Sequence, residues 1–245
     1  MTCLLYGIVF LGSRQRGRDS APLVLPSGVG GAVVRLVEEG ALGVAVSIVD
    51  PADLTPNVAR VLSFARVVEA LHAHRTVVPM RYGCLLGDEG QLVDLLRERG
   101  EEYAAILQRL DGCVEMGVRV LLPAEASAPR APVESAPRPA SGRDYLVDRA
   151  ARSTREEKFV SALAAAKERV LGALGGLAER TETDNNPRLD QRFSSLYFLV
   201  KRGLVESFRQ EFRRIEQTES VLLLLSGPWP PYTFVAPSPN ANGHG

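Results

Sequence analysis

The sequence from Cys113 onward carries the pattern that most restricts the possible folds. Residues 113–122 alternate between apolar side chains and Glu115, Gly117 and Arg119, which is typical of a strand with one buried face. Two later segments repeat apolar residues at intervals of three and four, which predicts a helix in each. The first stripe consists of Phe159, Leu163, Ala166, Val170, Leu174 and Leu177, and the second of Leu204, Phe208, Phe212 and Ile215.

Three further strands are expected around these helices. Residues 179–184 and 193–201 precede the second helix, and residues 220–225 follow it. The resulting order is strand, helix, strand, strand, helix, strand, which is the order of a ferredoxin-like domain. We therefore predict a modified ferredoxin-like domain over residues 111–226, with a helical extension. The stretch 123–141 is rich in Pro, Ala and Ser, which predicts an extended or disordered linker inside that domain.

Residues 1–110 predict a separate, mixed α+β domain, so that the whole chain is α+β with two domains. A buried strand is expected over residues 3–10, a hairpin over 32–38 and 42–49 with Gly40 at its turn, and a short strand over 76–80.

Two helices are predicted between and after these strands. The first follows Pro56, and its expected buried face consists of Val58, Leu62, Ala65, Val68 and Leu71. The second spans residues 88–110, where Gly100 is expected to kink or split it.

The charge balance and the apolar runs argue against two classes of partner. The chain has 29 Lys and Arg residues and 29 Asp and Glu residues. A nucleic-acid-binding protein usually has a basic surplus, because phosphate contacts supply much of its affinity. No apolar run approaches the roughly 20 residues that span a membrane, and the N-terminus lacks the features of a signal peptide. We therefore expect a soluble, cytoplasmic protein that binds neither nucleic acid nor membrane.

The residues that could carry catalysis or hold a metal are few and scattered. Cys3, Cys84 and Cys113 show no metal-ligand spacing, and the histidines show none either. No motif pairs a nucleophile with a base. We therefore predict no catalytic, metal-binding or cofactor-binding residue. We interpret the arginine-containing segment 12–18 as a solvated loop. We interpret the segment 184–187 as a turn rather than a calcium site.

The last apolar strand is followed by an unusual segment, Ser-Gly-Pro-Trp-Pro-Pro-Tyr-Thr-Phe-Val at 226–235. This segment resembles the GPWPPYSF signature of the gas vesicle proteins of the GvpF/GvpL family, with Thr233 where Ser is usual. Other stretches resemble the family in the same order. They are 5–9, 76–83 (with Tyr82 where Phe is usual), 107–120, 142–146 and 196–202.

The resemblance implies two α+β domains, a tail over residues 227–245 that returns to the first domain, and no enzymatic activity. It also implies a place at the gas vesicle, with the small shell protein GvpA and other gas vesicle proteins as partners and no small-molecule substrate. The role would be that of a minor structural component or of a chaperone-like assembly factor, and the sequence does not separate the two.

The candidate interaction residues lie in the tail, with one addition. Three prolines stiffen this segment, so that docking it costs little ordering entropy, and Trp229 is the only tryptophan of the chain. The tail is expected either to pack on its own first domain or to contact a partner. Arg81 is added as a further polar candidate, and the ordinary alternative for it is a salt bridge at the domain interface. The candidate residues are Gly227, Pro228, Trp229, Pro230, Pro231, Tyr232, Phe234 and Arg81.

An alternative function remains open at this point. Ferredoxin-like domains support many activities, so a small-molecule-binding or catalytic protein has the same expected fold.

Overall fold

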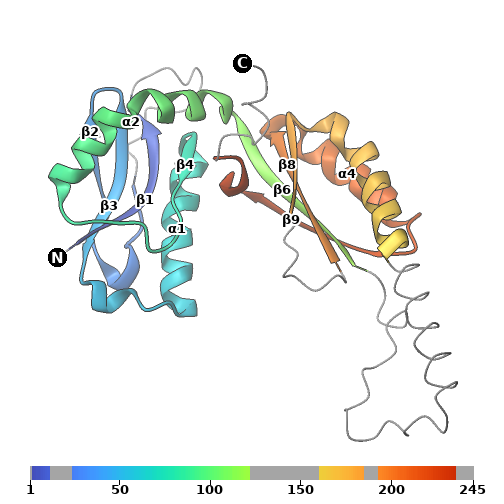
Figure 1. Cartoon of the computed structure of the whole chain (residues 1–245), viewed down its shortest axis with the longest axis horizontal. Coiled ribbons are helices and arrows are strands. Elements are labelled where there is room, and N and C mark those ends of the chain that lie inside the picture. The colour runs from blue at the N-terminus through green and yellow to red at the C-terminus, as the bar shows by residue number, and fades with distance from the viewer. Residues whose placement is uncertain (1, 12–23, 122–159, 185–192, 236–245) are drawn as a thin grey trace, which may run out of the picture. The chain divides into compact units, whose positions relative to one another are not determined.

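The structure, a computed structural model, describes residues 2–11, 24–121, 160–184 and 193–235. The chain divides into two compact units, one comprising Met1–Glu115 together with Pro228–Gly245 and the other comprising Met116–Gly227. Each unit contains one sheet with helices packed against it (Figure 1). The expected linker 123–141, the segment 142–146, the arginine-containing loop 12–18, the turn residues 185–187, Phe159 and His244 lie outside the described residues.

The first unit contains a five-stranded sheet in which the strands pair antiparallel. Their order is β2-β3-β1-β4, and β5 also pairs with β1; the bounds are β1 (Thr2–Phe10), β2 (Arg35–Glu39), β3 (Leu42–Val49), β4 (Val77–Pro79) and β5 (Leu85–Leu86). The first predicted strand and the hairpin are confirmed. Gly40, between β2 and β3, has a φ of 58°, a conformation that favours glycine.

The pairing of β1 with its neighbours depends on Gly7. The register between β1 and β3 shifts between Leu5 and Gly7. A Cβ atom at Gly7 would lie 2.6 Å from a side-chain carbon of Val77 and 3.2 Å from the carbonyl oxygen of Val78. Therefore β4 can approach β1 this closely only because residue 7 has no side chain.

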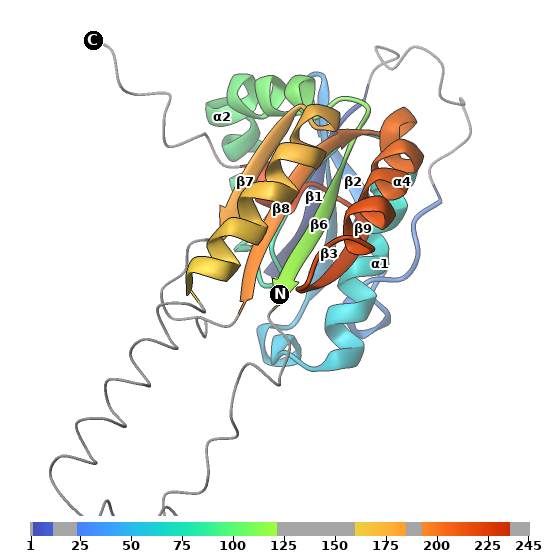
Figure 2. The ribbon, with the colours of Figure 1, turned by 90° about the vertical axis from the view of Figure 1, so that its right-hand side faces the viewer.

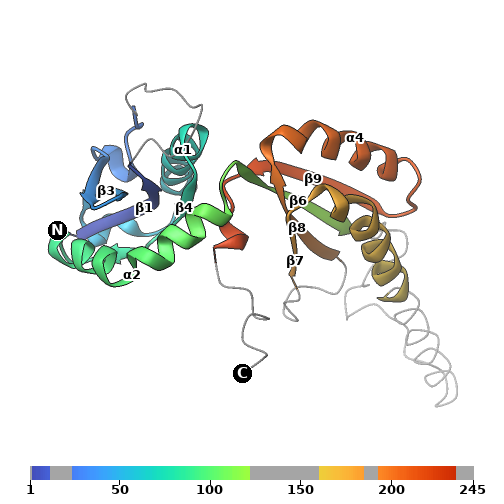
Figure 3. The ribbon, with the colours of Figure 1, turned by 90° about the horizontal axis from the view of Figure 1, so that it is seen from above.

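Two helices, α1 (Val58–His74) and α2 (Glu89–Arg109), lie on opposite faces of this sheet (Figure 3). Each begins with a side-chain cap, because Asn57 accepts a hydrogen bond from the Arg60 amide and Asp88 accepts one from the Gln91 amide, both at 2.9 Å. The expected split at Gly100 is wrong, since α2 runs through this residue without a break.

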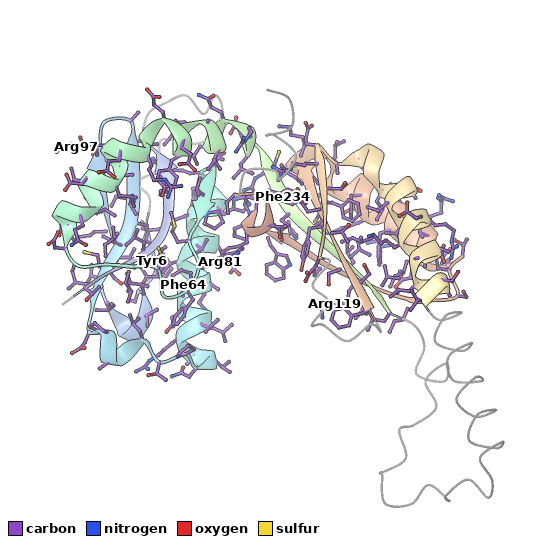
Figure 4. All side chains as sticks on the ribbon, in the orientation of Figure 1. Tyr6, Phe64, Arg81, Arg97, Arg119 and Phe234 are labelled. Carbon is purple, nitrogen blue, oxygen red and sulfur yellow. The ribbon has the colours of Figure 1, made fainter. Side chains whose placement is uncertain are left out.

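The buried face of α1 differs from the predicted one. Val68 and Leu71 are buried as expected, but Val58 is 77% exposed and Leu62 is 51% exposed. The core instead takes the neighbouring stripe of the helix, which consists of Phe64, Val67, Val68, Leu71 and His72. The reason is aromatic packing, because the Phe64 ring stacks on Tyr6 with ring centroids 4.9 Å apart (Figure 4). Phe64 also meets Tyr82 edge-on, at 5.5 Å between centroids.

The second unit contains a four-stranded sheet with the order β7-β8-β6-β9. The bounds are β6 (Cys113–Leu121), β7 (Arg180–Asp184), β8 (Phe193–Lys201) and β9 (Leu222–Trp229). The helix over residues 160–174 and α4 (Val205–Glu216) both lie on one face of this sheet (Figure 2). These elements confirm the strands and helices that the sequence predicts for this part of the chain.

The core of the second unit follows the predicted stripes closely. Ala166, Val170 and Leu174 are fully buried. Phe208 of α4 meets Phe198 of β8 edge-on, with ring centroids 5.2 Å apart. Leu204 is an exception, because it precedes α4 and is 40% exposed.

The end of β9 corrects a further expectation. The sequence suggested a strand that ends at Leu225, with the signature free of the sheet from Gly227 onward. The strand instead continues to Trp229 and includes Gly227 and Pro228. Because β9 is an edge strand, Pro228 is tolerated there although it lacks a backbone N–H.

Candidate functional site

The segment that follows β9 is held in the first unit by Glu115, which lies in β6. The Glu115 carboxylate accepts two hydrogen bonds from Thr233, one from its backbone N–H at 2.8 Å and one from its hydroxyl at 3.0 Å. Thr233 belongs to a short 3-10 turn, η6 (Tyr232–Phe234). Backbone N–H groups at the start of such a turn lack partners within it, so Glu115 supplies the acceptor that the turn needs. We call residues 230–234 together with Glu115 the tail clasp.

The carboxylate of the clasp is buried. Glu115 is only 6% exposed, and this burial raises the pKa of its carboxyl above the usual value. The two hydrogen bonds from Thr233 act in the opposite direction, because they stabilise the charged form. A buried carboxylate that receives two donors is a fixed structural contact rather than a solvated surface charge.

Tyr232 connects the tail clasp to the core of the first unit. It packs, partly buried, against the cluster that contains Tyr6 and Phe64. Burial raises the pKa of Tyr232 to about 12, and the negative charges of Glu69 and Glu115 act in the same direction. Phe234 is 1% exposed, and Pro230 and Pro231 are also buried. The second half of the signature is therefore part of the folded first unit.

The first half of the signature has a different environment. Gly227 has a φ of 104°, which a residue with a side chain rarely adopts. Pro228 is exposed, and Trp229 is 45% exposed even though it is the largest side chain of the segment. An aromatic side chain left half in solvent is of the kind that is enriched at protein interfaces.

Arg81, the remaining candidate, lies in the turn after β4 and is exposed. Its carbonyl oxygen accepts a hydrogen bond from the Cys84 amide at 3.1 Å. Gly83, with a φ of 85°, completes this turn. Within the described residues, the Arg81 side chain forms no ion pair. The salt bridge expected at the domain interface stays a prediction.

Sequence reasoning missed Glu115 as a member of the site. The alternating pattern of residues 113–122 predicts that Glu115 lies on the polar face of the strand. The structure confirms that Val114, Met116, Val118 and Val120 are buried, but Glu115 is buried too. Its partner Thr233 lies 118 residues away in the sequence. The available signals were the Glu within the stretch 107–120 that resembles the family, and the hydroxyl residue at 233.

The cysteines and the possible metal ligands of the described residues were candidates for a reactive or metal-binding site. Cys3 and Cys113 are buried, Cys84 is partly buried, and none of the three forms a disulfide. Burial raises the pKa of Cys3 and of Cys84, which disfavours the reactive thiolate. Among the described residues there is no group of three His, Cys, Asp or Glu side chains that could hold a metal ion. None of the helices in those residues is both long and apolar enough to span a membrane.

Comparison with known proteins identifies the class as gas vesicle proteins. The family model described as "Gas vesicle synthesis protein GvpL/GvpF" matches residues 2–236. The chain therefore belongs to the GvpL/GvpF family.

Relatives of both named types resemble this chain. Gas vesicle protein F of Streptomyces sp. (strain CB03234) is 29% identical over 254 residues, which cover 96% of this chain and 100% of that protein. Gas vesicle protein L of the same strain is 32% identical over 237 residues, which cover 86% of this chain and 87% of that protein.

Solved structures share the fold. The crystal structure of the gas vesicle protein GvpF from Anabaena sp. PCC7120 superposes with a TM-score of 0.74 at 20% identity, covering 97% of each chain. That of GvpF from Microcystis aeruginosa gives a TM-score of 0.73 at 16% identity, covering 96% of this chain and 99% of the other.

Proposed function

We propose that this protein is an accessory factor in gas vesicle assembly that binds the small shell protein GvpA and has no catalytic role. The chain belongs to a family described as gas vesicle synthesis proteins, which supports a role in gas vesicle assembly. The observation that supports binding is the unequal exposure of the signature, which holds Tyr232 and Phe234 in the fold and leaves Trp229 45% exposed at the end of β9.

The proposal divides the signature into two parts with different roles. Residues 230–234 fix the position of the end of β9, because both the backbone N–H and the hydroxyl of Thr233 donate hydrogen bonds to the Glu115 carboxylate. Pro228 and Trp229 then present a partly exposed apolar surface that is held at both ends. Such a preorganised aromatic residue binds a partner with little loss of conformational entropy.

We further propose that the second unit is a modified ferredoxin-like domain. Its elements follow the order strand, helix, strand, strand, helix, strand, and its sheet order is β7-β8-β6-β9. The helix over 160–174 and α4 lie on one face of the sheet, as this architecture requires (Figure 2). The domain boundaries near residues 110 and 227 belong to the same proposal.

Capture of GvpA by the full-length chain tests the proposed function. Immobilised GvpA is titrated with the wild-type chain, with Trp229→Ala, and with Leu62→Ala as a matched control. Leu62 is also about half exposed, but it lies on α1, away from the signature in sequence. If Trp229 is a central contact, its removal lowers the affinity about tenfold or more, the usual effect of truncating an interface aromatic. The melting temperature of Trp229→Ala should stay close to that of the wild type.

Two results would contradict the proposal. Wild-type protein that does not capture GvpA would refute the binding function. Equal capture by Trp229→Ala and by the wild type would show that the signature is structural only. Leu62→Ala should bind as the wild type does, and a loss there equal to that of Trp229→Ala would place the binding surface elsewhere.

A further inference from the structure

The edges of the two sheets are protected unequally. In the first unit, β2 carries Arg35 and Glu39 at its ends, and both form ion pairs with α2, namely Arg35 with Glu89 and Glu39 with Arg97. On the other side, β4 is three residues long and ends at Pro79. Charges, prolines and short strands are the devices that prevent the edges of sheets from pairing with other chains.

The two edges of the second sheet contrast with each other. One edge strand, β7, alternates charged residues along its length, namely Arg180, Glu182 and Asp184. The opposite edge strand, β9, begins with four consecutive leucines. No charged residue occurs between Glu219 and Val235, so β9 lacks the charges that protect β2 and β7.

The leucines of β9 divide between the two faces of the sheet. Leu223 is buried beneath the helices, whereas Leu222 is 51% exposed and Leu224 is 47% exposed. Ser226, the next residue on their face, points toward β6, where its hydroxyl donates to the Gly117 carbonyl oxygen at 3.4 Å. Among the described residues, β9 pairs with β6 on one side and no strand pairs with its other side.

We propose that the outer edge of β9 is a binding site for an extended, uncharged apolar segment of a partner protein, which adds to the second sheet as a further strand. An edge strand has a row of backbone N–H and C=O groups along its outer side. A further strand can form hydrogen bonds with all of them. Leu222 and Leu224 supply the side-chain contacts for alternate residues of that segment. A charged side chain packed against these leucines would lose hydration without gaining an ion pair, because β9 carries no charge, so the site favours an uncharged segment. This inference stands independently of the function proposed above, because the chemistry of the edge does not depend on which protein supplies the segment.

The end of β9 favours a different chain over a second copy of this one. Pro228 has no backbone N–H, and Gly227 has a φ of 104°, so regular pairing ends near Ser226. A second β9 would bring the same two residues to the interface, and two-fold pairing would be restricted to the short stretch 222–226. A partner segment without Pro or Gly adds no second restriction of this kind, because pairing is then limited only by Gly227 and Pro228 of β9.

A peptide pair tests the proposed site on the full-length chain. The probe is a capped, fluorescently labelled peptide of alternating valine and threonine, which is uncharged and prefers an extended conformation. Its control has the same sequence with alternate backbone nitrogens methylated, which removes donors and keeps the side chains. Binding is followed by fluorescence anisotropy. The wild-type chain should bind the probe, and the methylated peptide should bind about tenfold more weakly or not at all.

Variants place the binding on β9. Leu222→Lys/Leu224→Lys adds charge at two exposed positions, as β7 has, and should weaken probe binding about tenfold or more without lowering the melting temperature. Leu62→Lys on α1 is the matched control, because Leu62 is as exposed as Leu222; it should bind as the wild type does.

The following results would overturn the proposal. They are no binding of the probe to the wild type at concentrations up to about 1 mM, equal binding of the methylated peptide, or unchanged binding by Leu222→Lys/Leu224→Lys. Self-association of the wild type, measured by sedimentation and abolished by the same double variant, would replace the proposed occupant with a second copy of the chain.

Discussion

The two halves of the segment from Gly227 to Phe234 are adjacent in sequence but have opposite environments. Pro230, Pro231 and Phe234 are buried, and Tyr232 packs on the aromatic cluster of the first unit. Pro228 and Trp229 are exposed at the end of β9. The difference teaches that a single apolar, proline-rich signature can combine a structural contact with a presented surface. A substitution in either half should therefore be judged by different measurements.

The largest difference in stability is expected between Phe234→Ala and Trp229→Ala. Phe234 is 1% exposed, so its truncation should lower the free energy of unfolding by about 3–5 kcal/mol, the usual loss for a buried aromatic ring. Trp229→Ala, at a residue 45% exposed, should cost much less. Chemical denaturation of the two variants measures both values. Equal losses would erase the distinction between the two halves.

A smaller loss is expected for Glu115→Ala. This substitution leaves the Thr233 N–H and hydroxyl without their acceptors, and an unsatisfied buried donor costs about 1–3 kcal/mol. Glu182→Ala is the matched control, since Glu182 lies on the edge strand β7 and pairs only with its neighbour Arg180 at 2.8 Å among the described residues. A loss for Glu115→Ala no larger than that for Glu182→Ala would show that the tail clasp adds little stability.

Thr233 allows the hydroxyl to be tested separately from the backbone. Thr233→Val keeps the shape of the side chain and removes the donor to Glu115, and it should cost about 1 kcal/mol. Thr233→Ser keeps the hydroxyl and should cost less than Thr233→Val. Thermal melts of both variants measure the order. If Ser is as destabilising as Val, the methyl group rather than the hydrogen bond is the important contact.

The pH dependence of stability gives the smallest effect, and its sign follows from burial. Burial raises the pKa of Glu115 in the folded chain above the value of 4.5 for an unperturbed glutamate. The folded state therefore holds this proton more tightly than the unfolded state does. The resulting stabilisation is fully present below pH 4.5 and is lost as the pH rises through the raised pKa.

The variant Glu115→Gln separates the contribution of Glu115 to the pH dependence from that of the other titrating groups. Glu115→Gln cannot titrate, so the difference in unfolding free energy between wild type and Glu115→Gln should shift against the wild type as the pH increases across this window. Parallel denaturation curves at several pH values provide the measurement. A difference that shifts in favour of the wild type instead would mean that the hydrogen bonds from Thr233 outweigh desolvation.

Local sequence patterns predicted the elements well, because most helices and strands here carry a clear periodicity. The patterns were less able to select between competing faces. In α1, Val58 and Leu62 have the spacing of a buried stripe, but the stripe with Phe64 is buried because Tyr6 and Tyr82, which lie on distant segments, pack on its ring. Nothing within the helix itself distinguishes the two stripes.

The tail clasp shows the same limit more clearly. Alternation in β6 places Glu115 opposite the apolar face, and this placement is correct. Burial of Glu115 comes from a contact with Thr233, 118 residues later, which no local pattern contains. The extension of β9 was missed for another reason, because Gly227 and Pro228 normally end a strand and are tolerated here only at the edge of a sheet.

A double-mutant cycle between Glu115 and Thr233 tests most directly whether residues 230–234 are held by Glu115. The free energies of unfolding of wild type, Glu115→Ala, Thr233→Val and the double variant give the coupling between the two side chains. We predict a coupling of about 1–2 kcal/mol between these two side chains, and additivity for Glu115→Ala combined with Glu182→Ala, because β7 lies two strands away from β6 in the sheet. Additivity of Glu115→Ala with Thr233→Val, to within about 0.3 kcal/mol, would contradict the account.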